Sequence, residues 1–245
     1  MLTYNIRSWD NINGWPYPHI EYKDLRKLVR NFDIVLLQEV FEDHNKICQA
    51  INYPFHTKLQ YSIPILGDGL TRYSKIKFYK EPVRYKWEEC NGYLTSSSDC
   101  IANKGFTVTI HYPINNIPIL VYNVHLDAGD SSLDKATRQQ QLEQLAKNIA
   151  FREWHYSYKI PIIVAGDFNI KTDEKLIYLQ FLEDTGLQDT CYILKDQCKE
   201  EEIDKVIYKS SYIIKLEPIT YNKLEDINLS DHKPIYVDFI WEEEI

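Results

Sequence analysis

Short apolar runs, each about the length of a β-strand, are the feature of this 245-residue sequence that most limits its fold. Two clear examples are residues 34–37 (IVLL) and residues 160–165 (IPIIVA). No run approaches the roughly 18–20 consecutive apolar residues that a membrane-spanning helix requires. The sequence therefore predicts several short buried strands and no transmembrane segment.

A few amphipathic segments separate these strands. Leu25, Leu28, Val29 and Phe32 recur at the i, i+3, i+4, i+7 spacing of a helix over residues 21–32. A second apolar stripe predicts a helix over residues 134–150, whereas residues 53–103 give no clear pattern. The strands are expected at residues 2–6, 34–37, 104–110, 119–124, 162–165, 203–208 and 234–240.

This order of elements favours one architecture. Many short strands with a few helices indicate an α/β (α+β) sandwich, with packed sheets inside and helices outside. The sequence has no internal repeat, long linker or break in composition that would divide it. We therefore expect a single domain over residues 1–245, and a monomer.

The charge balance limits the partners. With 28 Lys and Arg against 36 Asp and Glu, the net charge is −8, which disfavours a protein that relies on non-specific attraction to phosphates. Residues 72–86 are locally basic, with aromatic residues interleaved. They suit either a strand pair with a solvated charged face, which we favour, or a surface that contacts nucleic acid or transiently docks on an anionic membrane.

The cysteines and the first residues bear on localisation. Five cysteines, with no CxxC motif, favour free thiols, although Cys90–Cys100 and Cys191–Cys198 would each close a short loop in an oxidising compartment. Residues 1–10 (MLTYNIRSWD) lack a basic segment followed by an apolar one, so we expect a cytoplasmic protein, with secretion as the alternative.

Polar residues stand at the ends of the apolar strands, where rigid functional groups are usually mounted. Each position alone has an ordinary structural explanation, such as a turn or a strand end. Five such ends in one domain favour a functional explanation. The residues concerned are Asn5, Gln38, Glu39, His125, Asp127, Asp167, Asn169, Asp231 and His232.

Their chemistry is that of phosphoester hydrolysis. Carboxylate and amide oxygens are hard ligands, which suit Mg²⁺ or Mn²⁺ better than zinc. A histidine can accept a proton from water near neutral pH, and amide and imidazole donors can stabilise the charge that develops on phosphoryl oxygens. No GxSxG, P-loop or HExxH motif offers a competing mechanism.

Six motifs in order make the sequence resemble the endonuclease/exonuclease/phosphatase superfamily, which has the DNase I-like fold. They are TYNIR (3–7), DIVLLQEV (33–40), NVHLDAG (123–129), GDFN (166–169), EIDKVIY (202–208) and SDHKPI (230–235). The resemblance implies a four-layered α/β sandwich with the site at one edge of two packed sheets.

The resemblance also implies roles for individual residues. Glu39 would be the principal metal ligand, assisted by Asn5 and Asp231. Asp167 would orient the attacking water, and Asn169 would contact the phosphate or the metal. His232 would act as general base or as a donor to the phosphate, held by Asp204, while His125 would donate to a non-bridging oxygen. Asp127 and Arg138 would bind substrate.

Within the superfamily, residues 99–106, 123–131 and 138–142 are similar to sphingomyelinase-type members. We therefore expect a metal-dependent phosphodiesterase acting on a phospholipid, with a DNA or RNA nuclease and an inositol-type phosphatase as alternatives. An inactive binding module on the same fold is the non-enzymatic alternative, which the complete set of catalytic residues disfavours. Trp9, Trp15 and Tyr17 would either pack a loop, which we favour, or contact a ligand.

Overall fold

The computed structural model describes residues 1–8, 21–41, 43–58, 67–92, 99–113, 117–194, 198 and 202–243. Its strands are β1 (Leu2–Ser8), β2 (Ile34–Val40), β3 (Phe55–His56), β4 (Thr71–Ser74), β5 (Val83–Lys86), β6 (Gly105–His111), β7 (Ile119–His125), β8 (Ile162–Asp167), β9 (Gln188–Asp189), β10 (Asp204–Lys209), β11 (Ile214–Lys223) and β12 (Ile235–Glu243). Its helices are α1 (Tyr22–Val29), α2 (His44–Ile51), α3 (Ser132–His155), α4 (Lys175–Thr185) and α5 (Thr190–Leu194), with a short 3₁₀ turn, η1 (Thr172–Glu174).

The strands form two six-stranded mixed sheets. The first has the order β11-β12-β1-β2-β4-β3, and the second has the order β5-β6-β7-β8-β10-β9. Each sheet contains one parallel pair at its centre, β1 with β2 and β7 with β8. Because parallel strands end at the same edge, each pair brings two strand ends together, and the register places Asn5 opposite Gln38 and His125 opposite Asp167.

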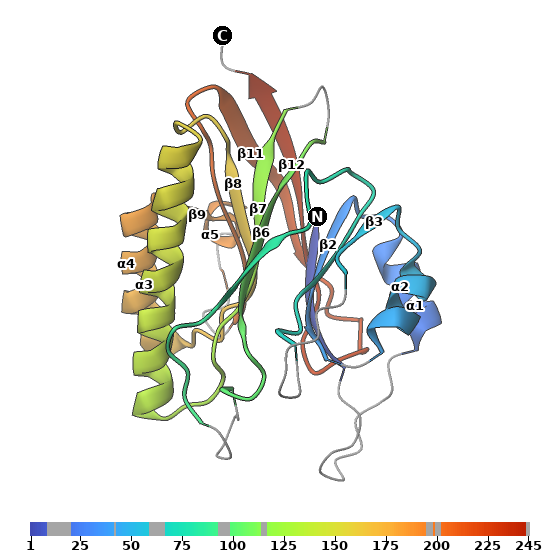
Figure 1. Cartoon of the computed structure of the whole chain (residues 1–245), viewed down its shortest axis with the longest axis horizontal. Helices are drawn as coiled ribbons and strands as arrows, with labels where there is room; N and C mark the ends of the chain where they lie inside the picture. Colours follow the sequence, from blue (N-terminus) through green and yellow to red (C-terminus); the bar gives the residue numbers. More distant parts are fainter. Residues whose placement is uncertain are drawn as a thin grey trace.

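The layers follow the expected arrangement, with both sheets inside and helices on the two outer faces (Figure 1). Helices α1 and α2 cover the first sheet, and helices α3 and α4 cover the second. Three apolar clusters fill the spaces between layers. The one between the sheets includes Leu36, Val121, Ala165 and Val206. The predicted four-layered α/β sandwich is confirmed.

The predicted elements are present, and most are longer than expected. Helix α3 begins at Ser132 rather than at residue 134, because Ser131 and Asp134 form a reciprocal capping box at its start. Residues 53–103 supply β3, β4 and β5, all short strands of two to four residues. Among the described residues, no helix is long and apolar enough to cross a membrane. Trp9, Trp15 and Tyr17 lie outside the described residues.

The structure contradicts the expected free thiols, and it contradicts the expected solvated face of residues 72–86 at Arg72. Four of the five cysteines are paired, Cys90 with Cys100 and Cys191 with Cys198, at Cα separations of 5.3 and 5.8 Å that suit a disulfide. Arg72 does not belong to a solvated charged face. It is fully buried between the sheets, where its guanidinium contacts Nε2 of His111 at 3.2 Å and donates to the Val121 carbonyl oxygen at 3.0 Å.

Candidate active site

Five strands deliver polar side chains to one edge of the sandwich. Asn5 and Glu39 come from β1 and β2 of the first sheet. His125, Asp167 and Asp204 come from β7, β8 and β10 of the second sheet. Both central parallel pairs end at this edge, so the side chains meet across the space between the sheets.

Asn5 joins the two sheets at the centre of the site. Its Nδ2 donates to Oε1 of Glu39 at 2.8 Å and to Oδ2 of Asp167 at 2.9 Å. Its Oδ1 accepts from the Arg7 backbone N–H at 3.1 Å. Asn5 is completely buried. With its nitrogen directed at the carboxylates, Asn5 holds the two acids in place.

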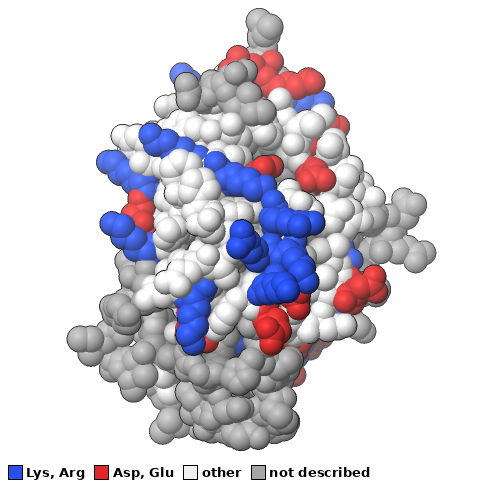
Figure 2. Space-filling model, turned by 90° about the vertical axis from the view of Figure 1, so that its right-hand side faces the viewer, with Lys and Arg blue, Asp and Glu red and all other residues white. Residues whose placement is uncertain are grey.

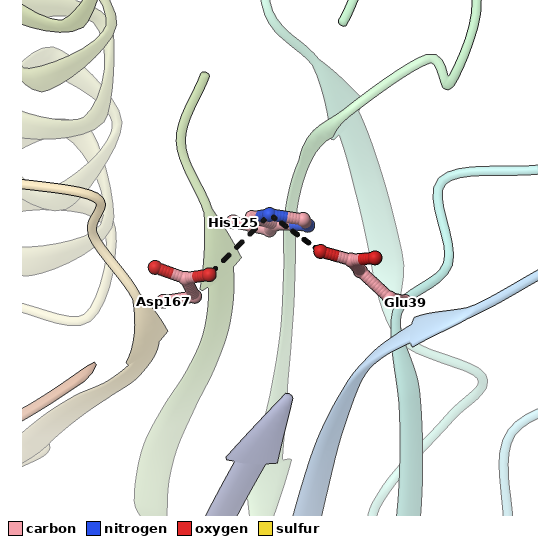
Figure 3. A group of neighbouring side chains, drawn as sticks. All are labelled: Glu39, His125 and Asp167. Atoms are coloured by element: carbon pink, nitrogen blue, oxygen red, sulfur yellow. Dashed lines mark ion pairs between the residues drawn. The ribbon is translucent and has the colours of Figure 1, made fainter. Parts of the chain in front are cut away.

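His125 lies between the same two acids (Figure 3). Its Nε2 is 3.8 Å from Oε1 of Glu39 and 3.6 Å from Oδ2 of Asp167. Burial lowers the pKa of His125 well below its usual value, and the positive charge of Lys104 adds to this effect. The imidazole is therefore neutral at pH 7, with one N–H donor and one acceptor nitrogen.

His232 and Asp204 form a close ion pair beside Asp167. Nδ1 of His232 is 2.7 Å from Oδ2 of Asp204, and Nε2 of His232 is 3.8 Å from Oδ2 of Asp167. Burial acts to lower the pKa of His232, but the charge of Asp204 outweighs it and the net shift is upward. In contrast to His125, His232 thus favours the imidazolium form at neutral pH, paired with a carboxylate.

The backbone of the site takes conformations that non-glycine residues rarely adopt. Glu39 and Asn169 have φ angles of 56° and 51°, in the left-handed region. Asn169 is fixed by two hydrogen bonds, from its backbone N–H to Oδ1 of Asp167 and from its Nδ2 to the Leu126 carbonyl oxygen. Such strain clusters at functional sites, where the surrounding structure maintains it.

Two groups of side chains at this edge could hold a metal ion. The first contains Glu39, His125 and Asp167, and the second contains Asp167, Asp204 and His232. Within each group the ligand atoms lie within 4.8 Å of one another. The carboxylates of Glu39 and Asp167 fit a hard divalent cation, which commonly takes one or two protein carboxylates. Buried Nδ1 of His125 and Oδ1 of Asp204 have no hydrogen-bond partner among the described residues.

The structure separates three predicted residues from this cluster. Asp231 forms an ion pair with Arg7 instead of joining either metal-binding group. Arg138 is fully buried and makes a two-pronged ion pair with Glu174, so it is not placed to touch a substrate. Asp127 is also fully buried, and its Oδ2 accepts from the Asn91 backbone N–H at 2.7 Å. The latter two side chains stabilise the loop that leads into α3.

Other polar residues beneath the site were not assigned roles from the sequence. Gln38 donates to Oδ1 of Asn123 at 2.7 Å, and Asn123 donates to the carbonyl oxygens of Leu37 and Thr71 on the opposite sheet. Both side chains are completely buried, so they fix the strand of Glu39 against the strand of His125. In the sequence, Gln38 stands out as a polar residue at a strand end, whereas Asn123 is marked only by its position within the NVHLDAG motif.

Comparison with known proteins identifies the family. Residues 3–203 match the model of endonuclease/exonuclease/phosphatase family 2. The chain belongs to the endonuclease/exonuclease/phosphatase family. A sphingomyelinase of Mycobacterium tuberculosis is 27% identical over 277 aligned positions, which cover 98% of this chain and 52% of the relative. The chain therefore spans about half the length of the curated relatives it matches.

Solved structures of other proteins share this fold. A beta toxin mutant from Staphylococcus aureus, determined with bound magnesium ions, superposes with a TM-score of 0.73 at 17% identity and covers 96% of this chain and 97% of its own. Sphingomyelinase C from Streptomyces griseocarneus superposes with a TM-score of 0.68 at 18% identity, with 96% of both chains covered. These likenesses confirm the DNase I-like arrangement of two sheets and flanking helices.

Proposed function

We propose that this member of the endonuclease/exonuclease/phosphatase family is a metal-dependent phosphodiesterase with a sphingomyelinase-like substrate. The observation that carries the chemistry is the position of Asp167, shared between a Glu39–His125 group and an Asp204–His232 pair. The mycobacterial sphingomyelinase, which aligns with 98% of the chain, supports the substrate class.

Glu39 and Asp167 would hold the cation, and Mg²⁺ is the ion we propose, with Mn²⁺ as a substitute. The oxygen donors support this choice, as do the magnesium ions bound to the related beta toxin mutant. When bound, such an ion neutralises the charge of phosphate oxygens and orients the substrate. The protein residues would supply the rest of the reaction.

Proton transfer would use the pair of acids around His232. A water oxygen forms the new bond to phosphorus as the bond to the leaving alcohol oxygen breaks. Asp167 accepts the proton of the water, and His232, held as the imidazolium by Asp204, donates a proton to the leaving oxygen. Nε2 of His232 is 3.8 Å from Oδ2 of Asp167, which is longer than a hydrogen bond, so the proton returns to His232 through solvent water afterwards. Neutral His125 donates to a non-bridging oxygen.

The test is an activity assay of the purified full-length protein with Mg²⁺ or with EDTA. The three substrates are sphingomyelin in mixed micelles, plasmid DNA and a soluble phosphoinositide. We expect release of phosphocholine from sphingomyelin with Mg²⁺ and none with EDTA. Preferential cleavage of DNA or of the phosphoinositide would replace the substrate class. Full activity in excess EDTA would contradict the metal requirement.

Two variants separate the proposed roles within that assay. His232→Ala should lower the rate about 10²–10⁴-fold at every Mg²⁺ concentration, because a proton donor is lost. Glu39→Gln should weaken metal binding, so that added Mg²⁺ restores part of the rate. An equal response of both variants to Mg²⁺ would contradict this division of roles.

A further inference from the structure

Helix α1 and its C-terminal cap residue, Arg30, carry a line of cations along their solvent face. At 100° per residue, four of them fall within an arc of about 100°, opposite the helix face that packs on the first sheet. All four are exposed, whereas Leu25 and Val29 on the packed face are buried. The four residues are Lys23, Arg26, Lys27 and Arg30.

Lys75, in the segment that follows β4, extends this line. Its Nζ donates to the Arg30 carbonyl oxygen at 2.7 Å, and Lys75 is itself exposed. We call these five residues the α1 basic surface. Figure 2 shows this side of the molecule, where Lys and Arg side chains gather into a band with acidic side chains at its margins.

Most of this charge is not neutralised within the described part of the protein. Lys27 pairs with Asp24 at 2.8 Å, but Lys23, Arg26 and Arg30 form no ion pair with a described acid. The whole chain has a net charge of −8. A cationic band on an acidic protein creates a strong charge asymmetry, which orients the molecule toward an anionic surface.

One end of the α1 basic surface adjoins the edge that carries the candidate active site. Tyr22, at the start of α1, donates through its hydroxyl to Oδ2 of Asp43 at 2.5 Å. Asp43 lies four residues after Glu39, just beyond the end of β2. The line of cations therefore starts beside the catalytic edge and runs away from it along the helix.

We propose that the α1 basic surface docks the protein on an anionic phospholipid bilayer, next to the substrate that the site hydrolyses. The choice of a bilayer over another polyanion rests on the proposed function, since a sphingomyelin-type substrate lies in a membrane. Each Lys or Arg held at an anionic membrane strengthens binding by about fivefold, so a surface of five supplies substantial attraction. This attraction is independent of the chemistry at Asp167.

The test is flotation of the full chain with vesicles in EDTA, which prevents metal-dependent hydrolysis during the measurement. The vesicles contain phosphatidylcholine alone or with about 30 mol% phosphatidylserine, a content that makes their surface anionic. The wild-type chain should bind the anionic vesicles at least about tenfold more tightly, and about 0.5 M NaCl should abolish the difference. The triple variant Lys23→Glu, Arg26→Glu, Arg30→Glu should lose the preference for anionic vesicles.

A matched variant controls for net charge. The control is the triple variant Lys147→Glu, Lys159→Glu, Lys215→Glu, whose three lysines are exposed and lie outside the α1 basic surface. It changes the net charge of the protein by the same amount and should bind vesicles as the wild type does. A milder variant, Lys23→Gln, Arg26→Gln, Arg30→Gln, removes the three positive charges without adding negative ones. Circular dichroism checks that each variant folds. All variants should hydrolyse sphingomyelin in neutral detergent micelles at the wild-type rate.

The outcomes separate this proposal from the proposed function. Equal binding of wild type to anionic and neutral vesicles, or equal loss in the two triple variants, would overturn the docking proposal. Tighter binding to duplex DNA than to anionic vesicles, lost in the α1 variant, would reassign the surface to nucleic acid and overturn it also. Selective vesicle binding without sphingomyelin hydrolysis would retain the docking surface and reject only the substrate class.

Discussion

At the scale of single residues, burial and neighbouring charge give the two histidines of the site opposite protonation states. His125 is buried near the positive charge of Lys104, so it remains neutral. His232 is held at 2.7 Å from Asp204, and the attraction to this carboxylate exceeds the cost of burial. A single site thereby contains one neutral imidazole and one imidazolium, the two forms that donation to an oxyanion and proton transfer require.

Asp127 should make the stability of the protein depend on pH. Burial, with the nearby charge of Asp99, raises its pKa from 3.8 to about 6. A carboxyl whose pKa is higher in the folded state stabilises the fold when protonated, and this contribution is lost as the pH rises from 3.8 through about 6. The Asn side chain of Asp127→Asn stays neutral. As the pH rises from 4 to 7.5, the free energy of unfolding of this variant should therefore increase by about 2–3 kcal/mol relative to that of the wild type.

Urea unfolding of both proteins at the two pH values measures this difference. Asp226→Asn is the control, because that aspartate is exposed and stays in water after folding. A gain for Asp127→Asn that is the same at pH 4 and pH 7.5 would show that ionisation of Asp127 is not its cause.

Sequence reasoning succeeded for residues whose position follows from a strand end. Glu39, His125 and Asp167 each finish or nearly finish an apolar strand, so their convergence follows once the strands are placed in parallel pairs. The orientation of Asp231 and Arg138 depends on partners far away in the sequence, Arg7 and Glu174, which no local pattern indicates. The same reason explains why the buried Gln38–Asn123 contact was not expected.

At the scale of elements, the close approach of β7 and β8 depends on a glycine. Gly166 has a φ angle of 147°, and a Cβ atom placed there would lie 2.0 Å from the carbonyl oxygen of Val124. Because His125 and Asp167 stand directly beyond this contact in the paired strands, the glycine also sets the spacing between two site residues. Its place in the GDFN motif thus has a backbone explanation in addition to any chemical one.

Gly166→Ala should consequently destabilise the fold by at least about 2 kcal/mol, because the backbone oxygen cannot move away without breaking the strand pair. Gly186→Ala is a matched control, since Gly186 also has a positive φ of 67° but its Cβ would meet only the flexible end of Lys209. That control should cost about 1 kcal/mol. Denaturant unfolding compares the two, and equal losses would contradict the clash at Val124.

Helices and strands with a clear apolar pattern in the sequence were predictable. Strands that form only because they pair with a neighbouring strand were not. The apolar stripe of α3 and the runs of β2 and β8 are visible in the sequence alone. In contrast, β4 has the sequence TRYS and is a strand because it pairs with β2 and buries Arg72 against the second sheet. Tertiary contacts of this kind override the local preference of a polar segment.

At the scale of the whole molecule, the core does not depend on a metal. The three apolar clusters fill the spaces between layers with aliphatic and aromatic side chains, and the candidate metal ligands lie at one edge. Chelation should therefore abolish activity and leave the fold intact. Binding of Mg²⁺ at about tenfold its dissociation constant stabilises by about 1.4 kcal/mol, which raises Tm by about 3–6 °C.

Circular dichroism and thermal unfolding with EDTA or with Mg²⁺ measure this effect. Glu39→Gln, which removes one proposed ligand charge, should show a smaller shift of Tm with Mg²⁺ than the wild-type chain shows. Loss of far-ultraviolet circular dichroism on chelation would instead indicate a structural metal.

The order of the strands has a consequence for synthesis of the protein. The first sheet contains β1 and β2 from the start of the chain and β11 and β12 from its end, and all six strands of the second sheet lie between them in the sequence. During synthesis on a ribosome, β1 cannot pair with β12 until all strands of the second sheet have been synthesised. His232, just before β12, is the last residue of the site to emerge, so a nascent chain has no Asp204–His232 pair and cannot carry out the proposed reaction.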